Sequence, residues 1–255
     1  MNKLQRCLGS ACCGVAILVA CAVMPVRADD QAFDVSGNAG VVTDYLFRGL
    51  SQTDRQPALQ SGIEIDGKQG LYIGAWGSNI SWLSDGSSTA APISSSLEVD
   101  GYAGWRKSFA SGVSLDVGIY TYVYPGTYPA GFTSADTTEG YVGVGYAGFK
   151  LKYSHAFTNL FGFANSKNSA YWDLSWGHDL GDAWSISAHV GHQTIQHVTK
   201  GDYTDWNIGV SRSFAHGYAV GLGYYDTNAD RGVYTNAYNH YLGRATAVLS
   251  LSKSF

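Results

Sequence analysis

Apolar and polar side chains alternate along most of this chain. In the segment 113–123 the odd positions carry Val, Leu, Val, Ile, Thr and Val, whereas the even positions carry Ser, Asp, Gly and two Tyr. Successive side chains of a strand point to opposite faces, so a period of two predicts a strand with one apolar and one polar face. Segments 172–177, 184–191 and 205–211 repeat the pattern. The sequence therefore predicts an all-β protein.

We predict twelve strands from this alternation. Their ranges are 33–47, 58–66, 70–80, 95–107, 112–124, 139–147, 149–158, 170–178, 184–195, 203–213, 217–227 and 240–255. Their usual length of about nine to thirteen residues fits a tilted strand that crosses a membrane, which needs about 9–11 residues. Strands of soluble proteins are shorter, at about 5–6 residues.

The connections between these strands fall into two classes that alternate strictly. Short turns are expected near 67–69, 108–111, 148, 179–183 and 214–216, and longer loops near 48–57, 81–94, 125–138, 159–169, 196–202 and 228–239. Brief periplasmic turns and longer outer loops are typical of a transmembrane barrel. We therefore predict an antiparallel up-and-down β-barrel that spans a membrane, with both ends of the barrel chain on the periplasmic side.

Composition agrees with this fold. The chain has 255 residues with 32 Gly and 18 Tyr, and only 14% of its residues are charged. Aromatic residues gather at both ends of the predicted strands, which is typical of the two interfacial girdles of an outer-membrane barrel. The ordinary enrichment of Tyr and Trp in strands is the alternative explanation.

Residues 1–28 have the pattern of a secretory signal peptide, which leaves 29–255 as one barrel domain. Lys3 and Arg6 precede an apolar core at 15–24, and a Val-x-Ala cleavage site ends at Ala28. An uncleaved membrane anchor is one alternative, and a lipobox that makes Cys21 a lipidated N-terminus is another. All four cysteines lie in this segment, so the exported chain would lack disulfides and thiolate nucleophiles. Its excess of acidic residues disfavours nucleic acid as a partner.

The chain ends on Phe255, preceded by apolar residues at 245, 247, 249 and 251. This ending resembles the C-terminal signature of bacterial outer-membrane barrels, which their assembly machinery reads. The predicted location is the outer membrane of a Gram-negative bacterium, reached through the periplasm. The expected partners are the barrel assembly machinery and outer-membrane lipid.

The stretch 43–54 followed by 57–60, together with 74–79, resembles the signature of the TorF family of outer-membrane porins, a proteobacterial family without a characterised function. The resemblance implies an outer-membrane pore and carries over no catalytic residue. The residues that match its motif in the first long loop are Arg48, Gln52, Asp54 and Pro57. This loop either folds inward, serves assembly, or is a polar structural turn.

If the apolar face meets lipid, the polar face lines a lumen. The candidate pore-lining residues are Glu98, Asp100, Arg106, Asp116, Lys150, Lys152, Asp173, His189, Asp205 and Arg244. An excess of acidic residues over basic ones predicts a mild preference for cations. Because twelve strands lie between the filled barrels of about 8 and the open porins of about 16–18, the polar set either lines a narrow pore or forms a salt-bridge network that plugs it.

The function that follows is a porin for passive diffusion of small hydrophilic solutes, without enzymatic activity, cofactor or metal. Gly143–Gly148 spells G-x-G-x-x-G, but a nucleotide site needs this motif to open a helix, and another predicted strand follows. His189 and His192 would point to opposite faces of a strand. A non-conducting structural or adhesive barrel, a barrel-embedded lipase or protease, and a soluble β-sandwich are the alternatives.

Overall fold

The computed structural model describes residues 33–255, so the predicted signal peptide and Cys21 lie outside the described residues. The described chain forms fourteen strands and two single-turn 3-10 helices, Ser84–Gly86 and Ala215–Gly217. The strands are β1 Phe33–Val42, β2 Leu46–Phe47, β3 Leu50–Ser51, β4 Ala58–Gly67, β5 Leu71–Asn79, β6 Leu97–Ser108, β7 Ser114–Val123, β8 Thr137–Tyr146, β9 Phe149–Ala156, β10 Ala170–Gly181, β11 Trp184–Thr194, β12 Tyr203–Ser213, β13 Tyr218–Thr227 and β14 Thr246–Ser254. Within 33–255, no helix has the length and apolar character needed to cross a membrane.

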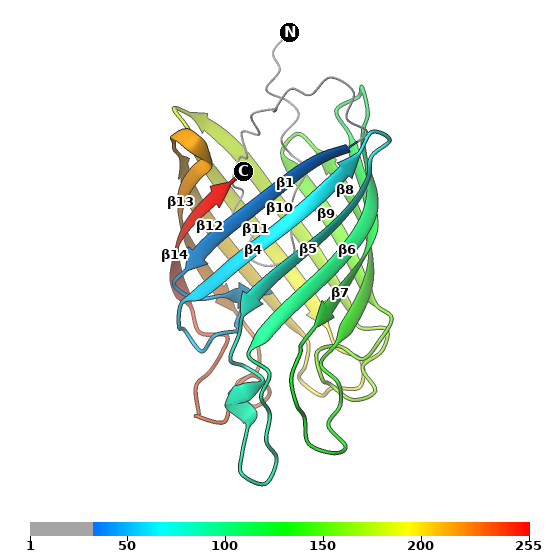
Figure 1. The fold of residues 1–255 in the computed structure, drawn as a ribbon, viewed down its shortest axis with the longest axis vertical. Helices are drawn as coiled ribbons and strands as arrows, with labels where there is room; N and C mark the ends of the chain where they lie inside the picture. Colours follow the sequence, from blue (N-terminus) through cyan, green and yellow to red (C-terminus); the bar gives the residue numbers. More distant parts are fainter. Residues whose placement is uncertain (1–32) are drawn as a thin grey trace.

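Twelve of these strands close into one antiparallel barrel, which confirms the predicted fold class (Figure 1). Each barrel strand pairs with its neighbours in the chain, and β1 closes the ring by pairing with β14. The short turns lie at one end of the barrel, together with the start of β1 and the end of β14, and the long loops lie at the other (Figure 1). We name the two halves of the lumen the short-turn half and the long-loop half.

Two of the predicted strands exceed the observed ones by five residues or more. The alternation predicts a first strand that reaches residue 47, but the chain leaves the wall after Val42, and β2 and β3 pair only with each other. It predicts a last strand from residue 240, but β14 begins at Thr246. At the first of these places the alternation continues into a loop whose apolar side chains pack inside the mouth of the barrel, as Tyr45 and Phe47 do.

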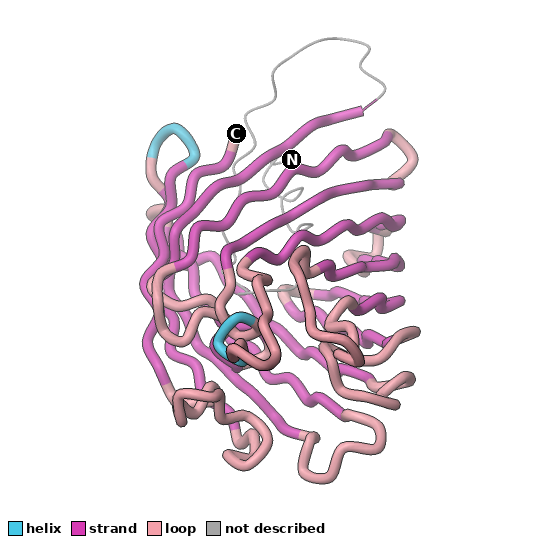
Figure 2. Tube along the Cα trace, turned by 60° about the horizontal axis from the view of Figure 1, so that its bottom comes forward, coloured by secondary structure: helices cyan, strands magenta, loops and turns pink. Residues whose placement is uncertain are grey.

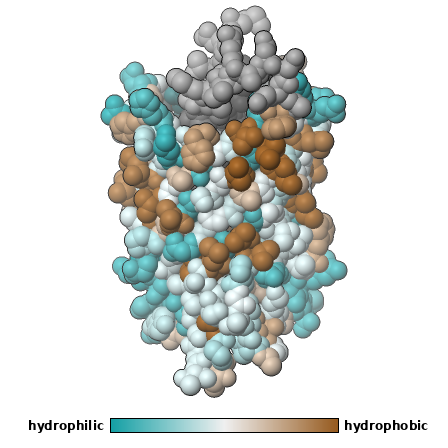
Figure 3. Space-filling view, in the orientation of Figure 1, coloured by the Kyte–Doolittle hydropathy of each residue, from teal (hydrophilic) through white to brown (hydrophobic). Residues whose placement is uncertain are grey.

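The two faces of the wall differ as the alternation predicts. On β12 the side chains of Asp205, Asn207 and Ser211 are buried inside the barrel, whereas Trp206 and Ile208 are exposed on the outside. Figure 3 shows such apolar side chains gathered on the outer surface of the wall, with hydrophilic ones toward its ends. An outward apolar band around a polar interior is the arrangement of a transmembrane barrel.

Phe255 completes the seam between the first and last strands. Its backbone exchanges two hydrogen bonds with Gly37, at 2.8 and 3.0 Å. The Phe255 ring lies over Gly37, where a Cβ atom would come within 2.5 Å of it. The chain terminus therefore extends the closing strand pair, and the lack of a side chain at Gly37 makes room for its ring.

Candidate functional site

The first long loop folds into the lumen as a short hairpin formed by β2 and β3. Its turn is Arg48–Gly49, and both residues have positive φ, at 48° and 78°. Two-residue turns of this kind favour a glycine because a side chain strains the left-handed backbone. The tip reaches β12, three strands from β1 around the ring, since a Cβ atom on Gly49 would lie 2.6 Å from Cβ of Asp205. The hairpin thus spans the barrel interior.

Arg48 fixes the hairpin to the far wall of the barrel, formed by β8, β10 and β11. Its guanidinium donates to Oε2 of Glu139 on β8 and to Oε1 of Gln193 on β11, both at 2.6 Å. The same group lies 4.3 Å from the ring centroid of Tyr171 on β10. The ion pair is almost fully enclosed, with side-chain exposures of 2% and 1%. Loss of either partner would leave the other charge buried without compensation. The pair therefore holds the hairpin firmly in place.

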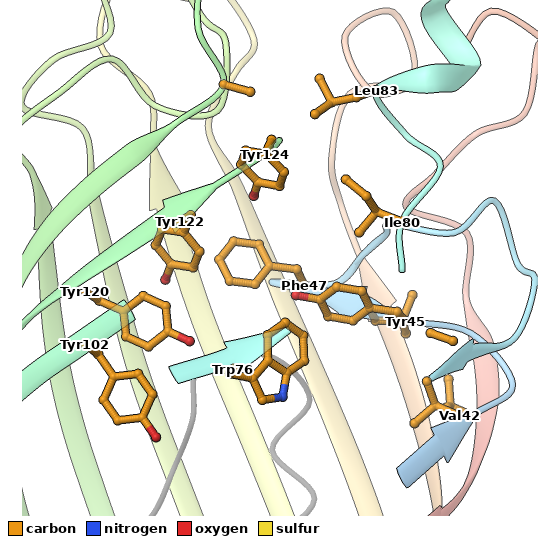
Figure 4. Close-up of a cluster of buried hydrophobic side chains, with 14 of the residues drawn as sticks. Val42, Tyr45, Phe47, Trp76, Ile80, Leu83, Tyr102, Tyr120, Tyr122 and Tyr124 are labelled. Atoms are coloured by element: carbon orange, nitrogen blue, oxygen red, sulfur yellow. The ribbon is translucent and has the colours of Figure 1, made fainter. Parts of the chain in front are cut away.

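Aromatic side chains fill the space around the hairpin (Figure 4). The Phe47 ring packs edge-on against Tyr122 and Phe161, at centroid distances of 5.5 and 5.3 Å. Tyr45 packs edge-on against Trp76 at 5.5 Å. Figure 4 shows Phe47 between a column of tyrosines from the wall and the aliphatic residues on the other side. These contacts bury the hairpin and occupy the long-loop half of the lumen.

The neighbouring loops add to this closure. Figure 2, in which the long-loop end comes forward, shows the connection with the helix Ser84–Gly86 in front of the barrel interior. Ile80 and Leu83 of this connection belong to the buried cluster around the hairpin. The amide of Ser81 also donates to the Gln52 carbonyl at 2.8 Å. The second long loop therefore packs over the first.

Asp44 organises the base of the hairpin. Its Oδ1 accepts hydrogen bonds from Ser51 at 2.7 Å and from Thr53 at 3.3 Å. Its Oδ2 is buried without a hydrogen-bond partner. Burial raises the pKa of Asp44 to about 6, against the lowering effect of the two hydroxyls and of nearby Arg55. Asp44 therefore holds its proton more tightly in the docked loop than an ordinary aspartic acid does.

Two buried carboxylates lie below the hairpin on β6. Glu98 and Asp100 are each 1% exposed. Tyr120 donates to Asp100 at 2.8 Å, and the hydroxyls of Tyr45 and Tyr124 are directed toward Glu98. Within residues 33–255 neither carboxylate has a basic side chain within 4.0 Å, and each keeps one oxygen without a hydrogen bond. They form an acidic site that no basic residue of the described chain neutralises at close range.

The short-turn half carries charges that are paired and partly accessible to water. Arg106 on β6 pairs with Glu64 on β4 at 2.8 Å, and its guanidinium lies 3.7 Å from the ring centroid of Tyr72. Lys150 on β9 pairs with Asp116 on β7 at 3.3 Å, with side-chain exposures of 27% and 20%. Alternating charges thus follow each other around the inner wall.

A histidine continues this series. His189 on β11 lies between two carboxylates, with Nδ1 3.2 Å from Asp173 and Nε2 2.9 Å from Asp205. The Tyr171 hydroxyl, whose ring lies beside Arg48, donates to Asp205 at 2.9 Å. Through Tyr171, the paired charges of the wall connect to the hairpin anchor.

Nine of the ten candidate pore-lining residues lie on the inner face of barrel strands. They are Glu98, Asp100, Arg106, Asp116, Lys150, Lys152, Asp173, His189 and Asp205. Arg244 is the exception, because it precedes β14 and its side chain is exposed. The prediction for Arg244 is wrong because the last strand begins six residues later than the alternation indicates.

The four motif residues of the first loop lie in different surroundings. Arg48 is the buried anchor, and Gln52 donates to the Leu50 carbonyl at 2.9 Å. Asp54 pairs with His240 of the last loop at 2.8 Å, near the outer surface. The Pro57 carbonyl accepts a hydrogen bond from Asn79 at 3.3 Å. Only Arg48 of these four spans the lumen.

Sequence reasoning missed the partners of Arg48. Glu139 is the third residue of β8, and Gln193 is the tenth of β11, both on inner faces. Alternation places Glu139 inside the barrel, but it does not connect this residue to the first loop. The Arg48–Gly49 dipeptide between the apolar residues Phe47 and Leu50 is a local signal for a hairpin.

The glycine-rich motif and the histidine pair lie as their spacing predicts. Gly143–Gly148 spans the end of β8 and the turn to β9, with no helix after it. His189 is buried inside the barrel, and His192 is exposed outside. In the part of the chain that the structure describes, no three His, Cys, Asp or Glu side chains gather as a metal site would need.

The barrel is similar to solved outer-membrane channels. The NanC porin matches with a TM-score of 0.54 at 12% identity, over 87% of this chain and 99% of that chain. The KdgM porin matches with a TM-score of 0.52 at 8% identity, over 87% and 97%. An outer-membrane channel from Pseudomonas putida F1 matches with a TM-score of 0.50 at 10% identity, over 89% and 97%. At these identities the likeness shows a common fold.

No curated protein matches the sequence. The resemblance to the TorF family stays a prediction. Residues 27–255 match a bacterial family described as having unknown function, and the chain belongs to that family, Gcw_chp.

Proposed function

We propose that this protein is an outer-membrane channel for small hydrophilic solutes, closed in this structure by the β2–β3 hairpin. The observation that carries the proposal is the contrast inside one barrel. The short-turn half has partly exposed charged side chains, as a water-filled lumen does. The long-loop half is filled by a hairpin that is not part of the wall.

The hairpin is suited to move because it is attached mainly by side chains. Its two strands pair only with each other. Its fixed contacts with the far wall are the Arg48 hydrogen bonds and the packing of Phe47. Withdrawal of the hairpin would open the long-loop half without breaking the wall.

We further propose that the channel prefers cations. Glu98 and Asp100 lie under the hairpin without a basic partner within 4.0 Å in the described chain. When the hairpin withdraws, water reaches these side chains, and hydrated carboxylates without a basic partner attract cations and repel anions. In the short-turn half, by contrast, acidic side chains are paired with basic ones. Glu64 pairs with Arg106 and Asp116 with Lys150, so their charges cancel. The preference therefore depends on the carboxylates of β6.

The porin comparisons support a channel by fold alone. One of the similar porins, KdgM, was solved in complex with oligogalacturonate. For this chain we propose passage of small hydrophilic solutes and assign no reaction. We also propose that a signal peptide exports the chain and that the assembly machinery reads the strand ending at Phe255.

Liposome swelling tests the channel proposal directly. Proteoliposomes with the folded barrel should swell in isotonic solutions of small sugars or amino acids, and the rate should fall as solute size increases. A variant that lacks residues 46–51 should swell faster. If a folded barrel and this variant both fail to admit any solute, the channel proposal is wrong and a non-conducting barrel replaces it.

A further inference from the structure

Basic side chains on the outer face of the wall are restricted to one end. The outward-facing Lys and Arg residues of the described barrel strands are Lys107, Arg212 and Lys253. Each is the second-last residue of its strand, β6, β12 or β14, at the short-turn end. The opposite end of the outer face has no such residue among the described strands. The barrel surface is therefore asymmetric in charge.

These three residues differ from the basic residues inside. Arg48, Arg106 and Lys150 each have a carboxylate within 4.0 Å. Within residues 33–255, none of the three outward residues forms such an ion pair, and each lies over an aromatic ring instead. The rings are Phe109 for Lys107 at 5.4 Å, Trp184 and Phe214 for Arg212 at 5.4 and 5.3 Å, and Tyr218 for Lys253 at 4.8 Å.

Arg212 and Lys253 flank a single turn. Arg212 is directly opposite Trp184 in the β11–β12 pairing, and Lys253 is directly opposite Tyr218 in the β13–β14 pairing. The turn that joins β12 to β13 is closed by a 2.7 Å hydrogen bond from the Phe214 amide to the Tyr218 carbonyl. Two cations and three aromatic rings thus share one patch of the outer face.

The rings of this patch are accessible, with exposures of 40% for Trp184, 48% for Phe214 and 45% for Tyr218. Next to it on β13 and β14 lie the exposed apolar side chains of Leu222 and Leu251. Long basic side chains lay their carbon stems on apolar surface and direct their charge to the polar boundary. The patch therefore lies where the apolar band ends and lipid headgroups begin.

We propose that Arg212 and Lys253 bind the phosphate of an anionic phospholipid in the periplasmic leaflet. A cation without a protein carboxylate takes its counter-ion from its surroundings, and at this level the surroundings supply phosphodiesters. The guanidinium offers a planar pair of donors that suits phosphate. The Lys253 ammonium donates to the His216 carbonyl and has further protons for a second acceptor. This inference rests on the outer-membrane location in the proposed function.

The test is lipid competition. Purified folded protein is mixed with equal amounts of phosphatidylglycerol and phosphatidylcholine in detergent, and bound lipid is counted by native mass spectrometry. The wild type should retain phosphatidylglycerol preferentially. The R212Q/K253Q variant should lose this preference by about fivefold for each charge removed. K107Q is the matched control, because Lys107 lies over a single ring on β6, across the barrel from β12.

Three results would overturn the proposal. The first is an absence of any lipid preference in the wild type. The second is a full preference in R212Q/K253Q, and the third is a loss of preference in K107Q as large as that in the double variant. Inorganic phosphate at the same concentration should not displace the lipid, and displacement would mean that the patch binds free anions rather than a headgroup. Solute passage through R212Q/K253Q should equal that of the wild type. If the lipid preference is absent, the channel proposal is unaffected. If solute passage is absent, the lipid proposal is unaffected.

Discussion

The two halves of the lumen are built on the same twelve strands but differ in how their charged side chains are paired and exposed to water. In the short-turn half, Lys150 and Asp116 neutralise each other while remaining partly exposed. In the long-loop half, Arg48 and Glu139 are enclosed, and Glu98 and Asp100 are buried without a basic partner in the described chain. The inserted hairpin makes the difference, because it removes the second set from water. A polar inner face therefore does not by itself make an open pore.

The comparison also shows why the hairpin anchor is strong. Exposed ion pairs are worth about 0–1 kcal/mol, because water competes for both partners. Breaking a buried pair by removing one partner costs about 3–5 kcal/mol, because it leaves an uncompensated charge. Arg48 belongs to the second class, and Lys150 is closer to the first.

The largest effect is expected from Arg48→Ala. This change leaves Glu139 buried without its partner and releases the hairpin tip. A loss of about 3–5 kcal/mol corresponds to an increase of about two to four orders of magnitude in hydrogen exchange of amides 45–51. Exchange measured by mass spectrometry in detergent is the readout.

The matched control for Arg48→Ala is Lys150→Gln, which breaks an ion pair of the short-turn half. Hydrogen exchange of amides 45–51 should change little in the Lys150→Gln variant. The double variant R48M/E139Q should recover part of the protection, because no buried charge remains. Equal protection in the wild type and in Arg48→Ala would show that the arginine does not hold the hairpin.

A smaller effect concerns pH. Burial raises the pKa of Asp44 to about 6 from the ordinary 3.8, so the docked loop binds this proton more tightly than the released loop does. Docking is therefore most stable below about pH 4, and this contribution is lost as the pH rises through 6. Between pH 4 and pH 7 the equilibrium constant for docking should fall by about one to two orders of magnitude, because one pKa unit corresponds to a factor of about ten.

The variant Asp44→Asn isolates this contribution. It cannot ionise, so its protection at 45–53, corrected for the intrinsic exchange rate, should lack the difference between pH 4 and pH 7. Any other group that titrates between pH 4 and pH 7 affects the wild type and the variant alike and cancels in the comparison. An identical pH response in both proteins would contradict the role of Asp44.

The smallest effect concerns ion selectivity. The E98Q/D100N variant removes both unpaired carboxylates, so the cation preference of the open channel should fall by a few-fold. The D116N/K150Q variant removes one charge of each sign from the short-turn half and should leave the preference unchanged. Reversal potentials in a salt gradient measure the cation preference of each variant. A shift in the second variant that equals the shift in the first would place the selectivity elsewhere.

The wall could be predicted from the sequence because a closed barrel forces each strand to have a lipid face and a lumen face. Alternation alone therefore places Asp100, Asp116 and Asp205 inside the barrel, where the structure has them. The same rule fails at Arg244, because apolar and polar residues can also alternate in a loop. Alternation records which side chains are buried and does not show whether the backbone belongs to the wall.

The pairing inside the lumen could not be predicted. Arg48 and Glu139 are 91 residues apart, and their contact depends on the register of the intervening strands and on where the first strand leaves the wall. A shift of one residue in register would turn Glu139 toward lipid. The turn chemistry of Arg48–Gly49 indicates a hairpin locally, but its direction depends on the aromatic residues that receive it.

The central claim is that the β2–β3 hairpin closes the channel, and single-channel conductance in a planar bilayer tests it most directly. The measurement compares the folded wild type with the variant that lacks residues 46–51. We predict a small or intermittent conductance for the wild type and a severalfold larger, steady conductance for the deletion. Equal conductance in two barrels shown to be folded would contradict the account, because the hairpin would then not control the path.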